Sequence, residues 1–243
     1  TSPWRDATLA LLIAGFGLKM GLVPLHVWLP IAHPAAPMPA SAVLSGVIIK
    51  AGVIGLIRFL PFDVPLPDWG VALIAIGLFT AFYSVIIGIT QPNPKTVLAY
   101  SSVSQMGVVA TVFGMGLAAG QSSAVMAATF YSAHHLLAKG ALFLAVGVTA
   151  TTRPRRLWWV LAPAAILALG MGGLPLTGGA LAKLATKPIF GDGLVEWLAT
   201  ASAIGTTLLM LHFLRRLAAS AAPVPSASAP VGLAFPWLLM FVA

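Results

Sequence analysis

The sequence has no cysteine among its 243 residues and few charged side chains. Without cysteine there are no disulfides, no thiolate metal sites and no cysteine-held iron–sulfur clusters, so electron transfer has to take place on another polypeptide. Charged residues make up 7% of the chain and hydrophobic residues 59%, and the mean hydropathy is +1.00. This composition excludes a water-soluble domain and predicts a protein whose solvent is lipid. We expect neither a cofactor nor a metal site in this chain.

Acidic residues are especially scarce, because 5 Asp and Glu stand against 13 Lys and Arg, a formal net charge of +8. The basic residues are scattered through apolar segments and short loops and form no basic stripe, which excludes nucleic acid as a partner. The alternating strands of a membrane barrel are also absent, whereas apolar runs of about 20 residues, the length of a spanning helix, are present. The sequence therefore predicts an all-α, polytopic transmembrane helix bundle that forms a single domain.

Apolar runs separated by proline, glycine and charged residues predict about eight spans. These lie near residues 7–29, 40–60, 69–90, 95–118, 122–149, 157–188, 194–217 and 231–243. The first is too long for a signal peptide and is expected to stay in the membrane. The last is too short to cross a hydrocarbon core of about 30 Å, so we expect a truncated helix there. Residues 218–230, rich in Ala, Ser and Pro, predict a surface linker.

The loop charges predict an orientation in the membrane. One face collects basic residues without any acidic one, namely Lys95, Arg153, Arg155, Arg156, Arg215 and Arg216. The other face carries a nearly balanced set, namely Arg5, Asp6, Arg58, Asp63, Asp68, Lys187 and Asp192. The positive-inside rule assigns the basic face to the cytoplasm and the N-terminus to the outside. We expect a multi-pass protein of the inner membrane of a prokaryote.

Four lysines, Lys19, Lys50, Lys139 and Lys183, each fall near the middle of a separate predicted span. A lysine at that depth costs about 2.5–3.5 kcal/mol on an insertion scale. Snorkelling to the headgroups explains a lysine near a helix end, but it serves poorly for residues some ten positions from either end. No acidic residue lies at comparable depth to pair with them. Burial disfavours an unpaired ammonium, so such a lysine can load and release a proton.

His135 and Lys139 stand one helical turn apart, and Tyr131 extends the same stripe by another turn. Histidine exchanges protons near neutral pH, so this stripe predicts a proton relay. The alternative is a structural, hydrogen-bonded histidine in the bundle core. Metal binding by His134 and His135 is disfavoured, because adjacent helical residues point about 100° apart and no third ligand is near in sequence.

Two spans contain helix-breaking sequences at depth, at residues 21–26 (GLVPLH) and 172–179 (GGLPLTGG). The residues expected to break the helices are Pro24, Gly173, Pro175 and Gly178. Freed carbonyls at such breaks require a wet cavity or buried polar groups, and paired breaks indicate an inverted-repeat transporter. Lys19 precedes the first break and Lys183 follows the second. A proline kink without function is the alternative.

Residues 19–50 (KMGLVPLHVWLPIAHPAAPMPASAVLSGVIIK) resemble the signature of the antiporter-like subunits of respiratory complex I and of Mrp-type antiporters. Further matches follow in the same order at residues 95–107 (KTVLAYSSVSQMG), 134–143 (HHLLAKGALF) and 173–183 (GLPLTGGALAK). The resemblance therefore extends from Leu18 to about Lys187. Hydrogenase membrane subunits and inorganic-carbon uptake systems contain related subunits.

The resemblance implies a fold of fourteen helices with two inverted five-helix repeats and a broken helix in each. This chain resembles the portion from the seventh helix onward, with residues 7–60 ending the first repeat and residues 69–217 forming the second. Six preceding helices agree with the outside N-terminus expected from the charges. The implied proton relay consists of Lys19, Lys50, His135, Lys139 and Lys183. The implied supporting residues are His26, Tyr131, His134 and Ser104.

The sequence departs from the family pattern at two places. The membrane glutamate that pairs with the residue at Lys19 lies upstream of the first residue of this sequence, so another polypeptide or segment has to supply it. Ile31 stands where an aspartate is usual. We expect Lys19, Lys50, His135, Lys139 and Lys183 to face the bundle interior in one layer near the membrane midplane.

The predicted function is proton translocation through this relay, as a subunit of a larger complex I-like assembly, with other membrane subunits and the lipid bilayer as partners. The complex can have NADH:quinone oxidoreductase or hydrogenase activity, but this chain has no redox chemistry of its own. One alternative is cation/proton antiport of the Mrp type, in which Na⁺ or K⁺ is also carried. Others are energy coupling in inorganic-carbon uptake, a structural subunit without transport, and a carrier of an organic solute.

Overall fold

The computed structural model describes residues 4–221 and 231–242, and every regular element in these residues is a helix. The elements are α1 (Arg5–Met20), α2 (Trp28–Ala35), α3 (Met38–Val43), the π-helical turn η1 (Leu44–Ile48), α4 (Lys50–Phe59), α5 (Pro67–Gly88), α6 (Pro94–Ala119), α7 (Ser123–Thr151), the 3₁₀ turn η2 (Pro154–Arg156), α8 (Trp158–Gly172), α9 (Gly178–Phe190), α10 (Leu194–Ala219) and α11 (Val231–Val242). The all-α prediction is confirmed.

Five segments are long and apolar enough to cross a membrane. They are Met38–Phe59, which joins α3, η1 and α4, and the helices Pro67–Gly88, Pro94–Ala119, Ser123–Thr151 and Leu194–Ala219. The shorter helices α8 and α11 are apolar as well. Each of the eight predicted spans falls on helical residues; the first covers α1, the break and only the first two residues of α2, and the sixth covers α8 and most of α9. The predicted linker at 218–230 lies mostly outside the described residues.

The predicted helix breaks are both present, at residues 21–27 between α1 and α2 and at residues 173–177 between α8 and α9. Each break begins with a glycine at positive φ, 82° at Gly21 and 103° at Gly173. Glycine ends a helix in this left-handed conformation without the steric cost that a Cβ would add. At the second break the Thr177 hydroxyl accepts the backbone N–H of Ala180 and caps α9.

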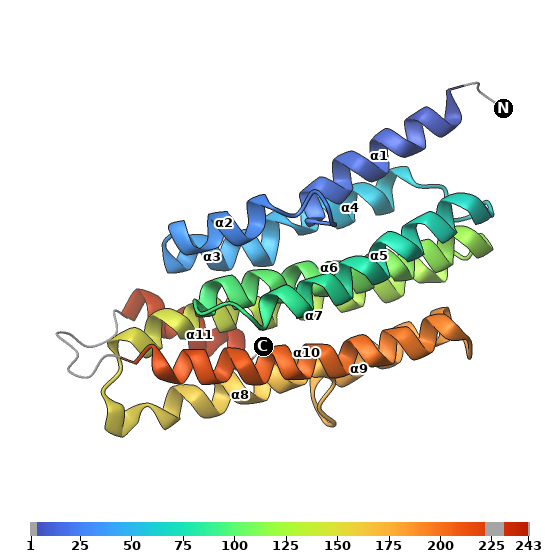
Figure 1. Cartoon of the computed structure of the whole chain (residues 1–243). Helices are drawn as coiled ribbons and strands as arrows, with labels where there is room; N and C mark the ends of the chain where they lie inside the picture. The colour runs from blue at the N-terminus through green and yellow to red at the C-terminus, as the bar shows by residue number, and fades with distance from the viewer. Residues whose placement is uncertain (1–3, 222–230, 243) are drawn as a thin grey trace.

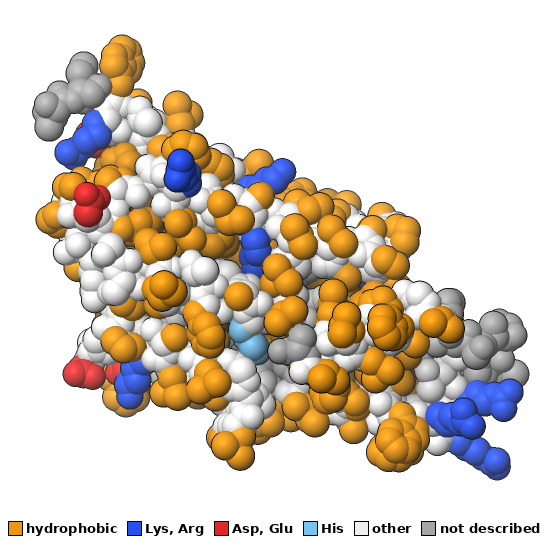
Figure 2. Space-filling view, turned by 180° about the vertical axis from the view of Figure 1, so that it is seen from behind, with side chains coloured by type: hydrophobic (Ala, Val, Ile, Leu, Met, Phe, Trp, Pro, Cys, Tyr) orange, Lys and Arg blue, Asp and Glu red, His pale blue; other side chains and the backbone are white. Residues whose placement is uncertain are grey.

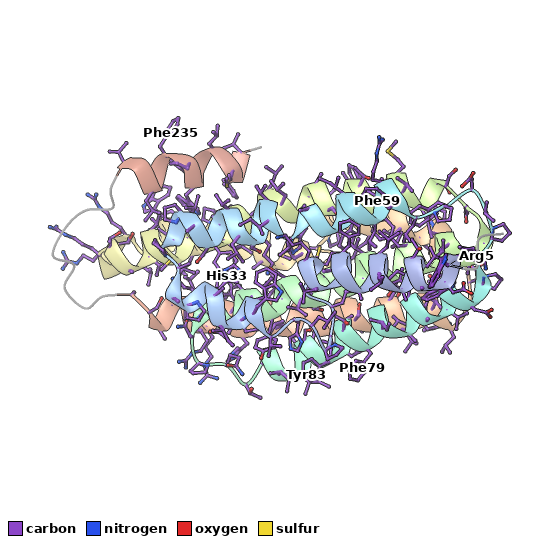
Figure 3. All side chains as sticks on the ribbon, turned by 90° about the horizontal axis from the view of Figure 1, so that it is seen from above. Arg5, His33, Phe59, Phe79, Tyr83 and Phe235 are labelled. Carbon is purple, nitrogen blue, oxygen red and sulfur yellow. The ribbon has the colours of Figure 1, made fainter. Side chains whose placement is uncertain are left out.

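The helices lie side by side in one elongated bundle with α6 at its centre. Figure 1 shows α1 and α2 above α3 and α4, then α5, α6 and α7, and finally α8, α9 and α10 on the opposite side. In the most apolar window of α6, 83% of the residues are buried inside the protein. Figure 3, seen from above, shows His33 among the helices and Phe235 pointing outward from α11.

Charged residues gather at the two ends of the bundle. Arg153, Arg155 and Arg156 follow α7, and Arg215 and Arg216 lie at the end of α10, which Figure 1 shows at the same end. In the space-filling view, basic side chains cluster at one end and acidic side chains lie at the other (Figure 2). The bundle therefore has one purely basic end, and the assignment of that end to the cytoplasm stays a prediction.

Small residues let α5 and α6 approach closely. A Cβ added to Gly107 of α6 would lie 2.5 Å from the Gly77 carbonyl oxygen and 2.7 Å from the Ala81 nitrogen of α5. Two turns further along α6, a Cβ on Gly114 would lie 2.7 Å from the Gly70 carbonyl oxygen. Backbones that touch in this way exclude water and lipid from the seam, as small residues do between membrane helices.

Gly107→Ala is expected to lower the free energy of unfolding by about 1–3 kcal/mol, because the added methyl group forces two backbones apart. The measurement is the midpoint of thermal unfolding of the purified protein in detergent. Gly15→Ala is the matched control, since a Cβ at Gly15 meets no atom within 4 Å. Equal midpoints for the two variants would contradict the close packing of α5 against α6.

Candidate functional site

Lys50 and His135 form a buried pair although 85 residues separate them. The Lys50 Nζ and the His135 Nδ1 are 2.5 Å apart, and the two side chains are 6% and 1% exposed. Lys50 begins α4, separated by one residue from the end of the π-helical turn η1, and its ammonium also donates to the Ser45 carbonyl oxygen at 3.5 Å. Such π turns leave carbonyls without their usual helical partner and often occur at functional sites.

Lys139 is fully buried one turn after His135 on α7. Its Nζ donates to the Leu98 carbonyl oxygen of α6 at 3.0 Å. The Ser102 hydroxyl donates to the same carbonyl oxygen at 3.1 Å and lies 2.7 Å from the Ser45 hydroxyl. Two hydroxyls thus bridge the acceptor of Lys139 to the turn beside Lys50. We call Lys50, His135, Lys139, Ser45 and Ser102 the central cluster.

No carboxylate takes part in the central cluster, so its amines are bonded to backbone carbonyl oxygens and, for Lys50, to an imidazole. The two ion pairs found in residues 4–221 and 231–242, Arg5–Asp6 and Lys187–Glu196, lie elsewhere. The His135 Nε2 is buried and has no hydrogen-bond partner among the described residues. This arrangement holds basic nitrogen atoms close together in an apolar interior without a compensating charge.

A second row of polar groups begins at Tyr131, one turn before His135. The Tyr131 hydroxyl donates to the Gln105 Oε1 at 2.5 Å, and the Gln105 Nε2 donates to the Thr206 hydroxyl at 3.0 Å. Thr206 donates in turn to the Ser202 carbonyl oxygen at 2.9 Å. The row crosses from α7 past α6 to α10.

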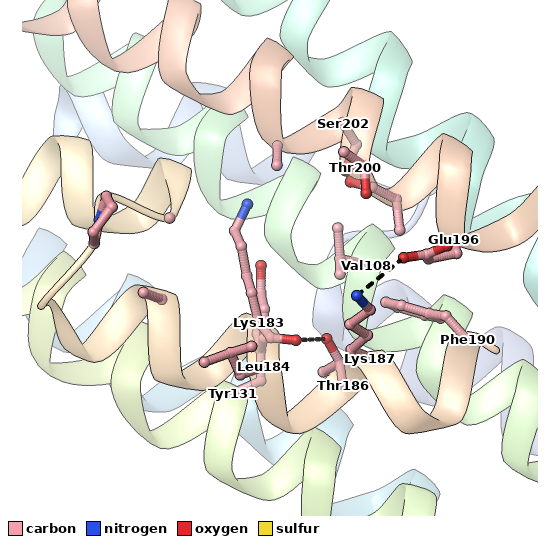
Figure 4. A pocket seen from close by; sticks show the side chains of 15 residues that line it. Val108, Tyr131, Lys183, Leu184, Thr186, Lys187, Phe190, Glu196, Thr200 and Ser202 are labelled. Carbon is pink, nitrogen blue, oxygen red and sulfur yellow. Dashed lines mark hydrogen bonds and ion pairs between the residues drawn. The ribbon is translucent and has the colours of Figure 1, made fainter. Parts of the chain in front are cut away.

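Tyr131 and Ser202 also line a cavity of about 430 Å³ between α7, α9 and α10. Lys183, in the second turn of α9 after the second helix break, projects into this cavity (Figure 4). A Cβ added to Gly173 would meet the Lys183 Cδ at 3.1 Å, so the glycine also makes room for the lysine side chain. The cavity joins the second break to the polar row on α7, α6 and α10.

A family model described as "NADH:quinone oxidoreductase/Mrp antiporter, TM" matches residues 2–211. The chain belongs to this family. Two curated relatives are similar to it. Hydrogenase-4 component B of Escherichia coli is 31% identical over 230 residues, which cover 85% of this chain and 34% of that protein. The putative antiporter subunit mnhA2 of Staphylococcus saprophyticus is 34% identical over 209 residues, 76% of this chain and 25% of that protein.

The fold is also similar to that of solved antiporter-family structures. A chain of the Mrp complex from Dietzia sp. DQ12-45-1b superposes with a TM-score of 0.79 at 20% identity, covering 98% of this chain and 55% of that one. The chain thus spans between a quarter and about half of the length of these relatives. The resemblance found in the sequence is confirmed, and so is the polytopic antiporter-like fold.

The structure brings three of the five predicted antiporter relay residues together, in the central cluster. Lys183 lies apart from them, partly buried in the cavity. Lys19 is exposed on α1, beside a hollow of about 400 Å³ that Phe16 and Ala51 also line. The expectation that all five face the bundle interior therefore does not hold for Lys19, because nothing in the described residues covers that side of α1. The relay role of each residue stays a prediction.

The predicted supporting residues occupy different places. His26 is buried at the first break with its ring 5.2 Å from that of Tyr83, edge to face. His134 packs against the second break, since a Cβ on Gly178 would lie 2.8 Å from its Cδ2. The Ser104 hydroxyl donates to the Ala81 carbonyl oxygen of α5, away from the central cluster. Only Tyr131 of the four touches the polar row.

The sequence did not reveal several residues of the site. Ser45 and Ser102 are common small residues in apolar helices, and only the turn η1 and the packing of α6 bring their hydroxyls together. Gln105, the most polar side chain in the centre of α6, is the one signal that could have been used. His33 was also missed: it is fully buried, stacked on Phe143 at 4.3 Å, and neither ring nitrogen has a partner among the described residues. Among residues 4–221 and 231–242, no three metal-ligating side chains come together.

Proposed function

We propose that this chain moves protons across a membrane as an antiporter-like subunit of a larger complex. The observation that supports this most is the central cluster, in which Lys50, His135 and Lys139 are buried together without a carboxylate. Enclosing uncompensated charge in an apolar interior is costly, so the cluster is stable with few protons and unstable with several. Such a site takes up a proton only when one has left, which is the behaviour of a relay.

The geometry supports a stepwise path along α7. A protonated Lys50 donates through its Nζ to the His135 Nδ1, and transfer along this bond leaves a neutral amine and a protonated imidazole. The imidazole then releases the proton from its Nε2, which has no hydrogen-bond partner in the described part of the chain, to the next group along the path. Lys139, one turn further, is the acceptor that we assign. The Ser45 and Ser102 hydroxyls offer a second bridge between the two lysines.

We assign the two remaining lysines, Lys183 and Lys19, to the two ends of the proton path. Lys183 lies in the cavity at the second break, and Lys19 lies on the uncovered side of α1 at the first. The family resemblance pairs the residue at Lys19 with a membrane glutamate that this sequence does not contain, so we assign that partner to additional polypeptide. Other membrane subunits supply the energy, and the basic end of the bundle faces the cytoplasm of a prokaryote.

Cation/proton antiport is the second candidate, favoured by the likeness of the fold to a chain of an Mrp complex. Na⁺ and K⁺ bind oxygen atoms, either carbonyls or carboxylates. The central cluster presents amines and an imidazole, and the carbonyl oxygens of Ser45 and Leu98 are already taken by lysines. The described contacts therefore favour the proton as the ion that passes this point.

Lys139→Ala is expected to leave the complex assembled, because removal of a buried amine that has no acidic partner relieves the cost of its desolvation. Proton uptake should fall by about tenfold or more, since His135 loses its acceptor. Lys139→Arg should fail almost as badly, because arginine keeps the charge but does not release its proton. The measurement is proton uptake into vesicles driven by the parent complex, compared at equal subunit abundance. Near-normal uptake with the arginine variant would show that Lys139 supplies only fixed charge.

Ser102→Ala removes the hydroxyl that links Ser45 to the Leu98 carbonyl oxygen. Proton uptake is expected to fall by about threefold to tenfold, the effect of one lost hydrogen bond of ~1 kcal/mol. Ser84→Ala is the matched control, because that buried hydroxyl bonds only within α5, to the Thr80 carbonyl oxygen. Equal rates for the two variants in the same vesicle assay would remove the hydroxyl bridge from the path.

A further inference from the structure

The cavity at the second helix break is lined by several polar side chains besides that of Lys183. Its lining includes one carboxylate, that of Glu196 at the beginning of α10, and four residues that carry hydroxyl groups, namely Tyr131, Thr186, Thr200 and Ser202. Figure 4 shows the Lys183 ammonium inside the cavity and Glu196 across it on the other helix. A volume of about 430 Å³ is large enough for several water molecules.

Glu196 has a second basic neighbour at the edge of the same cavity. Its Oε1 lies 3.8 Å from the Lys187 Nζ, one turn after Lys183 on α9. The Lys187 side chain is 62% exposed, whereas that of Glu196 is 25% exposed. The lysine therefore extends outward, and the carboxylate is held between an outer ammonium and the cavity that contains an inner one.

The other acidic residues of the chain do not line this cavity. Asp6 bonds with Arg5 and with the Trp69 ring nitrogen near the start of α1, and Asp63, Asp68 and Asp192 lie in loops or in a first helical turn. Glu196 is thus the carboxylate through which a proton on Lys183 can leave by this route. Glu196 lies in the first turn of α10, near whose other end Arg215 and Arg216 lie, so the route lies at the end of the bundle opposite the arginine cluster (Figure 1).

We infer that the cavity is a release vestibule in which Glu196 receives the proton of Lys183 and Lys187 resets the carboxylate. Lys183 loses its proton through water to a Glu196 oxygen, which leaves a neutral amine and a neutral carboxylic acid and breaks the ion pair with Lys187. Glu196 then gives the proton to bulk water, and the restored carboxylate pairs again with Lys187. This inference rests on the proposed proton translocation and adds the point of release.

Glu196→Gln is expected to reduce proton transport by the parent complex by about tenfold or more, because an amide does not take up the proton. Glu196→Asp should recover part of the rate. Lys187→Gln should cause a smaller loss than Glu196→Gln, since the receiving carboxylate remains but loses the ion pair that resets it, and the double variant Lys187→Gln/Glu196→Gln should be as slow as Glu196→Gln. Asp192→Asn is the matched control, an exposed carboxylate at the same end that should not matter.

A merely structural ion pair gives a different pattern, in which either single substitution causes the same loss of transport. That pattern, or full activity of Glu196→Gln, would overturn the inference. Lys139→Arg is measured in parallel to separate this failure from that of the proposed function. If Lys139→Arg stops transport and Glu196→Gln does not, the relay stands and the release vestibule is wrong.

Access of water to the cavity is tested independently of transport, and the absence of native cysteine makes this chain suitable. Ser202 lines the cavity but is only 2% exposed, so Ser202→Cys is reached by way of the cavity. A membrane-impermeant methanethiosulfonate should modify it in the assembled complex when added to the side opposite the arginine cluster. Ser101→Cys, fully buried on α6 and not in the lining, should stay unmodified. No reaction at Ser202→Cys, or reaction from the arginine side alone, would overturn the vestibule.

Discussion

The burial of basic nitrogen atoms without acidic partners is the constraint on which the rest of this structure depends. Lys50, His135 and Lys139 share an interior in which a single full charge is already expensive. Backbone dipoles partly compensate this charge, because the carbonyl oxygens of Ser45 and Leu98 accept hydrogen bonds from the ammonium groups of Lys50 and Lys139. Dipoles stabilise a charge less than a carboxylate would, so the proton stays exchangeable rather than permanently bound.

The helical scaffold provides these dipoles through local irregularity surrounded by tight packing. The π-helical turn η1 contains the Ser45 carbonyl oxygen that accepts from Lys50, and the glycine seam between α5 and α6 excludes lipid between these two helices. A regular helix in place of η1 would keep its carbonyls bonded to itself and leave Lys50 with His135 alone. Rigid packing and one local irregularity are therefore both needed. A loose bundle would let water reach the amines, and their charged forms would then no longer carry the desolvation cost that favours release of the proton.

The sequence revealed the features that depend on near neighbours. Glycine and proline marked both helix breaks, and spacing on one helix put His135 and Lys139 on one stripe. It did not reveal the 2.5 Å contact between Lys50 and His135, because residues 85 positions apart meet only through the packing of α4 on α7. Nor did it indicate that Lys19 is exposed, since depth along a helix does not specify which side the side chain faces. The fold class can be predicted from composition, whereas a proton relay depends on which side of its helix each side chain faces.

The two helix breaks differ in a way that bears on how much of a transport path one chain can contain. At the second break Lys183 faces a cavity bounded by α7, α9 and α10, so its surroundings are supplied by the described residues themselves. At the first break Lys19 faces a hollow with apolar walls, which no helix within residues 4–221 and 231–242 covers. Lys19 lies in the last turn of α1, at the break. An ammonium that faces lipid about ten residues from the headgroups is not stable, because its aliphatic stem cannot carry it that far. This difference is consistent with our proposal that additional polypeptide with an acceptor covers Lys19 on α1, whereas residues of this chain already surround Lys183 on α9.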